Sequence, residues 1–201
     1  MQPHSLLLAS ASPRRRELLR QIGLEPEVVV TNVDETRLPG EAPAVYVERL
    51  ARLKADTAWQ QLTHSRRGAV LAADTAVVLD GEIFGKPADR IEGLEMLARL
   101  SGRTHAVLTG VALRTTRGID VRVNVSQVTF RALQPDECEA YWESGEAADK
   151  AGGYAVQGLA ALFISAIEGS FSGVMGLPLY ETAELLRGAG IDPFTNLRAR
   201  R

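Results

Sequence analysis

Short apolar runs alternate with longer amphipathic stretches along most of the chain. The apolar runs predict β-strands at residues 6–9, 27–31, 69–79 and 159–167. Apolar positions three or four residues apart predict helices at 13–23, 44–62, 91–100, 135–143 and 179–186. Residues 104–115 and 121–130 alternate and predict a long antiparallel hairpin, and Asp80-Gly81 predicts a tighter hairpin with return strand 82–84. The pattern predicts an α/β fold, a mixed β-sheet with helices packed on it.

The strongest predicted strand, residues 69–79, is apolar on both faces apart from Asp74 and Thr75. Such a run is typical of a strand in the middle of a sheet. A carboxylate in that position is costly unless another group pairs with it. Asp74 therefore predicts a metal ligand or a general base; the alternative is a core aspartate that caps a turn or pairs with an arginine. In a regular strand, Thr75 points to the opposite face.

Three arginines, residues 14–16, follow the first predicted strand and the sequence Ser10-Ala11-Ser12-Pro13. Serine followed by proline is a helix-start signal. A helix N-terminus carries partial positive charge and normally prefers acids, so cations there are expected where an anion binds over them. Free N–H groups, hydroxyls and guanidinium groups together suit a phosphate. The alternative is a solvated basic helix face.

Two lysines and a pair of acids complete the candidate chemistry. Lys54 lies on the apolar side of the predicted helix 44–62, where it either snorkels to solvent or points at an anion. Lys86 follows the return strand 82–84, so the hairpin allows it to approach Asp74. Asp34-Glu35 follows a strand and suits a magnesium-type ion, although a solvated acidic turn is equally consistent. Together these groups suit phosphoanhydride chemistry.

Composition narrows the function classes. A net charge of −2 over 201 residues gives no bulk basicity that argues for nucleic acid. One cysteine, Cys138, excludes an intrachain disulfide, and with three histidines it argues against structural zinc. No apolar run reaches the length of a membrane span and no signal-peptide layout is visible, so we expect a cytoplasmic protein. The motifs of P-loop NTPases and Rossmann dehydrogenases are missing, and the scattered histidines form no catalytic triad pattern.

The length predicts one domain over residues 1–201, either undivided or with two lobes around a central cleft. Residues 193–201, which include three arginines, are expected to form a frayed tail.

Motifs spread in order from about Leu7 to Leu186 resemble the Maf family. They are Ser10–Arg15 (SASPRR), Asp34-Glu35, Ala51–Ala55 (ARLKA), Ala73–Thr75 (ADT), Gly85–Pro87 (GKP), Ser101-Gly102, Asp149–Tyr154 (DKAGGY), Gln157-Gly158, Ile167–Ser170 and Gly176–Pro178. The resemblance implies an elongated mixed α/β fold similar to that of the inosine triphosphatases. It also implies a nucleoside triphosphate pyrophosphatase that cleaves between the α- and β-phosphates and needs a divalent metal, Mg²⁺ or Mn²⁺.

The resemblance also assigns roles to residues. It makes Asp74 the proton acceptor and Glu35 a residue that binds metal or orients water, with both as metal ligands. Ser10, Arg15, Lys54 and Lys86 would hold the triphosphate, the two lysines as part of the catalytic set. Arg14, Thr75 and Gln157 match the positions that the dTTP/UTP branch uses for specificity. Gly85 departs from members that carry an acid there, which leaves the number of metal ions open.

The expected function is hydrolysis of dTTP and UTP, and of modified pyrimidine nucleotides, to the monophosphate and pyrophosphate. Gln157 suits this substrate because its amide can pair with the donor and acceptor edge of a pyrimidine. The alternatives are a 7-methyl-GTP pyrophosphatase, the other main branch, and a non-catalytic nucleotide-sensing regulator of cell division, since the family name is tied to septum formation. The resemblance further implies a homodimer, and neither a membrane nor stable nucleic-acid binding is expected.

Overall fold

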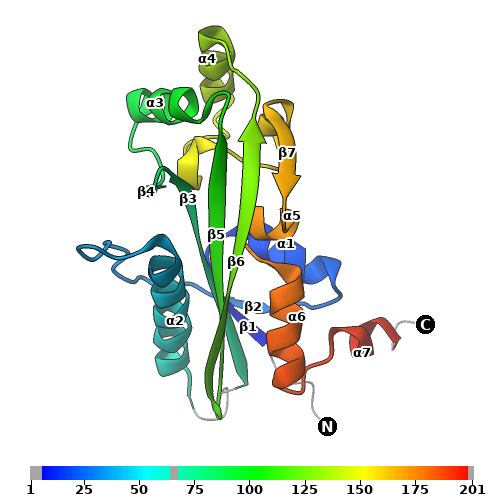
Figure 1. The fold of residues 1–201 in the computed structure, drawn as a ribbon. Helices are drawn as coiled ribbons and strands as arrows, with labels where there is room; N and C mark the ends of the chain where they lie inside the picture. The colour runs from blue at the N-terminus through cyan, green and yellow to red at the C-terminus, as the bar shows by residue number, and fades with distance from the viewer. Residues whose placement is uncertain (1–5, 64–67, 199–201) are drawn as a thin grey trace. The chain divides into compact units, whose positions relative to one another are not determined.

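The computed structural model describes residues 6–63 and 68–198 (Figure 1). Its strands are β1 (Leu6–Ala9), β2 (Glu27–Val29), β3 (Ala69–Leu79), β4 (Glu82–Phe84), β5 (Thr104–Thr115), β6 (Gly118–Phe130) and β7 (Ile164–Glu168). Its α-helices are α1 (Pro13–Gln21), α2 (Pro43–Gln61), α3 (Arg90–Leu100), α4 (Pro135–Glu143), α5 (Phe171–Val174), α6 (Leu179–Gly188) and α7 (Pro193–Arg198). Two short 3₁₀ helices are η2 (Ala151–Gly153) and η3 (Leu159–Leu162).

The seven strands form one mixed sheet in the order β2-β1-β3-β5-β6-β7, with β4 paired on β3. β1 pairs in parallel with both β2 and β3, whereas β3 with β4 and β6 with β7 are antiparallel. The α/β fold class with a mixed sheet and packed helices is therefore confirmed. No helix in the described residues is long and apolar enough to cross a membrane.

β3 has the boundaries that its apolar run predicts, and all of its residues except Thr75 are buried. It lies inside the sheet, between β1 and β5. The turn after it places Asp80 at φ 54° and Gly81 at φ 79°. Positive φ at both central residues is the type I′ geometry that matches the twist of a hairpin, so the Asp-Gly signal is confirmed.

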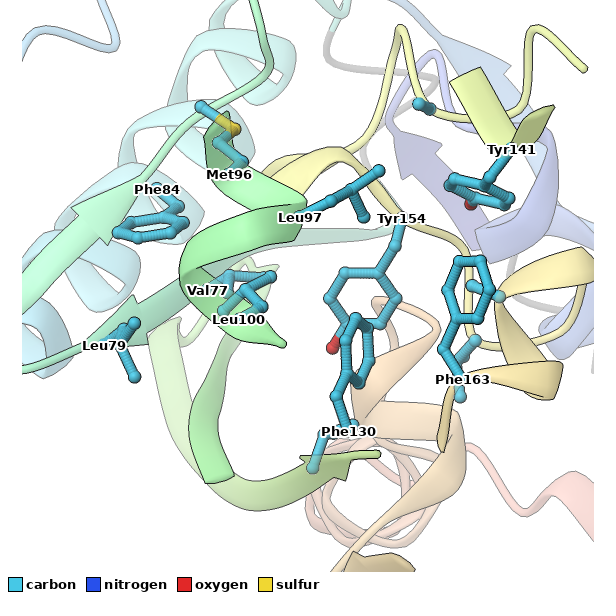
Figure 2. Packing of buried hydrophobic residues seen from close by; sticks show 14 of the residues in the cluster. Val77, Leu79, Phe84, Met96, Leu97, Leu100, Phe130, Tyr141, Tyr154 and Phe163 are labelled. Carbon is cyan, nitrogen blue, oxygen red and sulfur yellow. The ribbon is translucent and has the colours of Figure 1, made fainter. Parts of the chain in front are cut away.

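The described chain divides into two compact units, each with its own core. Unit 1 takes in residues up to 74, 109–124 and from 176 on; unit 2 takes in 75–108 and 125–175. The core of unit 1 packs α2 on β1 and β3 and contains Leu7, Ala9, Ala51, Ala55, Ala58, Trp59, Leu62, Val70, Ala72 and Ala112. The core of unit 2 is richer in aromatic residues; Tyr154, Phe130, Phe163 and Tyr141 gather in it (Figure 2), with successive ring centroids 4.9, 6.2 and 5.2 Å apart.

Helix α2 comes unusually close to β5 within unit 1. A Cβ placed on Gly110 would lie 2.4 Å from the carbonyl oxygen of Val47, so only glycine allows this approach. The buried face of α2 is also rich in alanine. Small residues at the contact bring the helix axis near the sheet, which brings a side chain such as Lys54 within reach of β3.

Two expectations differ from the structure. Residues 159–167 were expected to be one strand, but 159–162 form η3 and the strand begins at Ile164. The prediction was wrong because a short apolar run does not distinguish a strand from a helical turn, and here the N–H groups of Leu159 and Ala160 donate to the Glu146 carboxylate. Residues 193–198 of the expected tail form α7, which contacts α6; residues 199–201 lie outside the described residues.

Candidate active site

Lys54 of α2 joins two acids of unit 1. Its Nζ lies 2.6 Å from Oδ1 of Asp74 on β3 and 2.6 Å from Oε1 of Glu35 in the loop between β2 and α2. The Lys54 and Asp74 side chains are only 12% and 9% exposed, whereas Glu35 is 51% exposed. The ammonium therefore compensates the negative charge of the buried Asp74 carboxylate. It also contacts Glu35, which is more exposed. Of the two alternatives left open for Lys54, the structure shows the ammonium directed at anionic groups, the carboxylates of Asp74 and Glu35.

Ser10 and Arg15 lie at the end of β1 and the start of α1. The Ser10 hydroxyl oxygen accepts hydrogen bonds from the Ser12 N–H at 3.1 Å and from Arg15 Nη1 at 3.2 Å. Arg15 Nε also donates to the Gly176 carbonyl at 2.7 Å, which fixes the guanidinium from a second side. Ser12 is the N-cap of α1 but makes no capping bond with its side chain. The Ser12 side chain thus does not accept a hydrogen bond from the N–H groups of the first helical turn.

The guanidinium of Arg15 lies in the field of the two acids. Burial lowers its pKa, the charges of Asp74 and Glu35 act in the opposite direction, and Arg14 adds to the lowering. Arg14, Arg15, Glu35 and Asp74 are therefore electrically coupled within unit 1. Two arginines together at a helix start repel each other, and a bound polyanion would relieve that repulsion.

Arg16, the third arginine of the cluster, serves a different purpose. Its Nη2 lies 3.0 Å from Oε1 of Glu25, and the same carboxylate accepts from Arg20. These are exposed ion pairs at the other side of α1, where such contacts contribute little. Arg16 thus pairs with an exposed acid of its own, whereas Arg15 is held by Ser10 and Gly176.

The loop that carries Glu35 is held by residues that sequence reasoning missed. We call residues 30–42, between β2 and α2, the Glu35 loop. The Tyr46 hydroxyl donates to the Glu35 carbonyl at 3.0 Å. Burial, followed by the charges of Asp74 and Glu35, raises the pKa of Tyr46 to about 12, so it stays a donor at neutral pH. Asp34, the neighbour of Glu35, accepts from the Thr36 N–H at 2.9 Å and so shapes the loop instead.

An ion pair between Glu41 and Arg49 closes the same loop. Arg49 Nε lies 2.6 Å from Glu41 Oε1, and its Nη2 donates both to Glu41 Oε2 at 2.8 Å and to the Thr36 carbonyl at 3.1 Å. The Glu41 side chain is 3% exposed and also accepts from the Leu38 N–H at 3.1 Å. Hydrogen bonds from Arg49 lower the pKa of Glu41 to about 2, so the pair remains charged at all ordinary pH values.

The remaining predicted site residues belong to unit 2. Thr75 directly follows Asp74 in β3 and is half-buried. Lys86 is exposed in the segment after β4, where the Gly85 carbonyl accepts from the Gly152 N–H at 2.9 Å. Gln157 is exposed just before η3. Their predicted functions are taken up below as proposals.

Glu35 and Asp74 both reach one cationic nitrogen, the Nζ of Lys54, so the two carboxylates lie close together. No group of three or more histidine, cysteine or acidic side chains in the described residues could hold a metal on its own. Magnesium is commonly bound by one or two carboxylates and completed by water and substrate phosphates. The pair fits that kind of incomplete, substrate-dependent site.

The chain is similar to known proteins over most of its length. The family described as Maf-like protein matches residues 5–189. Proteins named dTTP/UTP pyrophosphatase are 55% identical in Methylococcus capsulatus, over 92% of this chain and 91% of that one, and 52% identical in Alkalilimnicola ehrlichii, over 95% of each. One in Bordetella parapertussis is 52% identical over 94% of each chain. Among solved structures, the Ham1 protein of Staphylococcus aureus is 18% identical, with a TM-score of 0.46 over 63% of this chain and 71% of that one.

Proposed function

The chain belongs to the Maf family, and on that premise we propose that it hydrolyses dTTP and UTP to the nucleoside monophosphate and pyrophosphate. The observation that carries the proposal is the position of Lys54 between Asp74 and Glu35 in unit 1. In the same unit, Arg15 is hydrogen-bonded to Ser10, and the charges of the two acids act on its guanidinium. A buried acid with a cation at 2.6 Å and a pair of coupled arginines is the equipment that hydrolysis of a polyanion requires.

The residues of unit 1 divide the chemistry between them. Asp74 accepts the proton of the attacking water, and its burial beside Lys54 keeps the carboxylate oriented. Arg15 and Arg14 stabilise negative charge on the phosphates, and the bond from Arg15 to Gly176 holds the guanidinium in place before substrate arrives. Ser10 accepts from both Arg15 and the Ser12 N–H, so its own hydroxyl hydrogen is directed elsewhere and can donate to a phosphate oxygen.

A divalent cation, Mg²⁺ or Mn²⁺, is part of the proposal, with Glu35 and Asp74 as its protein ligands. When bound, it would neutralise phosphate charge and polarise the phosphoryl group. With a cation held by these acids, Lys54 would be able to contact a phosphate oxygen as well as a carboxylate. A lysine suits this better than an arginine, since its ammonium is a point charge on a flexible stem.

The residues of unit 2 are proposed to complete substrate recognition. Lys86 is assigned to the triphosphate, and Thr75 and Gln157, together with Arg14 of unit 1, to the choice of base. The exposed amide of Gln157 offers both a donor and an acceptor, which matches the edge of a pyrimidine. The expected homodimer and cytoplasmic setting stay predictions.

A substrate panel tests the proposal. Purified protein is mixed with dTTP, UTP, CTP, ATP, GTP and 7-methyl-GTP, with Mg²⁺, with Mn²⁺ or with chelator, and nucleotide products and pyrophosphate are measured. We expect dTTP and UTP to give the monophosphate and pyrophosphate in equal amounts, only with metal. Preference for 7-methyl-GTP would move the protein to the other branch. Nucleotide binding with negligible turnover would favour a regulator.

A further inference from the structure

The backbone on both sides of Gln157 is held more tightly than its exposed side chain suggests. Tyr154, Ala155 and Val156 before it are buried, and so is Ala160 after it. We call residues 155–160 the Gln157 segment. Apart from η3, which begins at Leu159, it contains one turn, in which the Gly158 N–H donates to the Ala155 carbonyl at 3.0 Å. Its other backbone groups need partners from elsewhere.

Two side chains of unit 2 supply those bonds. The Tyr141 hydroxyl accepts from the Ala155 N–H at 3.1 Å, at the start of the segment, and donates to Glu146 Oε1 at 2.7 Å. Glu146 in turn accepts from the Leu159 N–H at 2.9 Å and the Ala160 N–H at 3.3 Å, at the end of the segment. The Tyr141–Glu146 pair thus bridges both ends of the short stretch whose middle residue is Gln157.

This pair is itself anchored in the core of unit 2. Tyr141 is 3% exposed, and its ring packs edge-on against Phe163 with centroids 5.2 Å apart (Figure 2). A buried hydroxyl with one donor and one acceptor partner has a fixed orientation, which it passes on to the Glu146 carboxylate. The network therefore transmits the rigidity of the core to the backbone around Gln157.

The glycine after Gln157 is explained by the same contact. A Cβ on Gly158 would lie 2.0 Å from Glu146 Oε2 and 2.3 Å from its carboxyl carbon. Any larger residue would have to displace the carboxylate. In the Gln-Gly pair of the sequence motif, Gln157 is the residue proposed to recognise the base. Gly158 has no side chain and so leaves room for the Glu146 carboxylate.

We propose that Glu146, braced by Tyr141, is a positioning residue for base selection. It fixes the backbone on both sides of Gln157 so that the amide meets the pyrimidine edge in one orientation. The proposal rests on the proposed function, because it deepens the assignment of Gln157. Amide recognition depends strongly on angle, so a displaced segment loses selectivity while the phosphate-binding groups of unit 1 keep their contacts.

The test compares kcat and KM for UTP and GTP in wild type, Glu146→Ala, Glu146→Gln and Gly158→Ala. We expect Glu146→Ala to lower the UTP/GTP ratio of kcat/KM on the order of fivefold, with GTP hydrolysis nearly unchanged. Glu146→Gln keeps one acceptor oxygen and should recover part of the ratio. Gly158→Ala leaves Glu146 in the sequence but displaces it, so it should resemble Glu146→Ala. Should Glu146→Ala fail to fold, the other two variants carry the test.

Glu137→Ala is the matched control, because this carboxylate also accepts a backbone N–H, that of Gln134, and pairs with Arg131, but has no bond to the Gln157 segment. It should leave the ratio within twofold of wild type. A parallel loss for both nucleotides in the Glu146 and Gly158 variants would overturn the positioning inference and leave the proposed function intact. A wild-type protein that hydrolyses neither nucleotide would overturn both.

Discussion

The Glu35 loop of unit 1 and the Gln157 segment of unit 2 are both irregular backbone held in place by a carboxylate, but the partners of the two carboxylates differ. Each presents an exposed side chain with a proposed function from irregular backbone, and each is held by a carboxylate. In the Glu35 loop the carboxylate is Glu41, which is ion-paired with Arg49. In the Gln157 segment it is Glu146, whose partners are a tyrosine hydroxyl and two backbone N–H groups.

The difference in partners fits the difference in task. An ion pair with a bidentate guanidinium resists changes of pH, and the low pKa of Glu41 keeps it charged. That suits a loop whose acid, Glu35, is proposed to take part in the same chemistry for every nucleotide. The hydrogen bonds that hold the Gln157 segment depend on angle, which suits a segment proposed to select one base edge from another. Perturbing the first should therefore change rates uniformly, whereas perturbing the second should change selectivity.

The largest expected effect is that of Asp74→Asn, which removes the proposed base and touches neither loop. Turnover should fall on the order of 100-fold or more for every nucleotide, the usual scale for loss of a general base. The fold should persist because Lys54 keeps Glu35 as a partner. The rate is measured by pyrophosphate release, and retention of the fold is checked by thermal melting. Asp56→Asn, which loosens the ion pair between Asp56 on α2 and Arg114 on β5, is the control. Near-normal turnover in Asp74→Asn would remove Asp74 from the mechanism.

Acid should weaken unit 2 before it weakens the Glu41–Arg49 pair. His105 is buried, its Nε2 lies 2.8 Å from the Tyr154 hydroxyl, and burial lowers its pKa to about 4. In the unfolded chain histidine titrates near 6.5, so between pH 6.5 and 4 the unfolded state binds the extra proton and stability falls as pH falls. This residue alone should cost about 2 kcal/mol of unfolding free energy between pH 7.5 and 5.

Urea unfolding at several pH values measures that slope, and His105→Gln is the control because glutamine does not titrate but can still bond Tyr154. The variant should be less stable than wild type at pH 7.5 yet lose less on going to pH 5. Equal pH slopes in the two proteins would show that His105 is not the group responsible.

The sequence was most informative where a residue conflicts with its own surroundings. Asp74 in an apolar run and Lys54 on an apolar helix face both need a partner, and the structure shows that they are each other's partner at 2.6 Å. β1 and β3 have their predicted boundaries. The long run of β3 is apolar on both faces, which is typical of a strand inside a sheet. The α/β class followed from the same pattern.

The supporting residues gave no such signal. Glu41, Arg49 and Glu146 are charged residues in polar stretches, where most charges are solvated, and Tyr46 looks like any half-apolar helix residue. Their roles depend on tertiary contacts, which local pattern does not encode. The error at residues 159–163 has the same origin: the Glu146 carboxylate, 13 residues before Leu159, takes the N–H group that a strand would have used.

Gln157→Ala directly tests the prediction that a change in the Gln157 segment alters nucleotide selectivity. Loss of the amide should lower the UTP/GTP ratio of kcat/KM by about tenfold, the worth of one or two hydrogen bonds, while GTP hydrolysis stays near wild type. Steady-state kinetics with both nucleotides measure the ratio. Gln134→Ala, at the N-cap of α4, is the control of the same residue type in unit 2. An equal loss for every nucleotide would contradict base recognition by Gln157.

Arg49→Lys should have the smallest effect. It tests the prediction that a change in the Glu35 loop alters the rates for all nucleotides equally. Lysine keeps the charge opposite Glu41 but lacks the fork that reaches both its carboxylate and the Thr36 carbonyl, so the Glu35 loop should loosen without losing its ion pair. We expect kcat to fall roughly threefold for UTP and GTP alike, with their ratio unchanged. Arg52→Lys, which alters an exposed pair with Glu48 on the same helix, should leave kcat as it is. If Arg49→Lys instead changed the ratio, the Glu35 loop would take part in base selection, and the division of labour between the two carboxylate-held segments would be wrong.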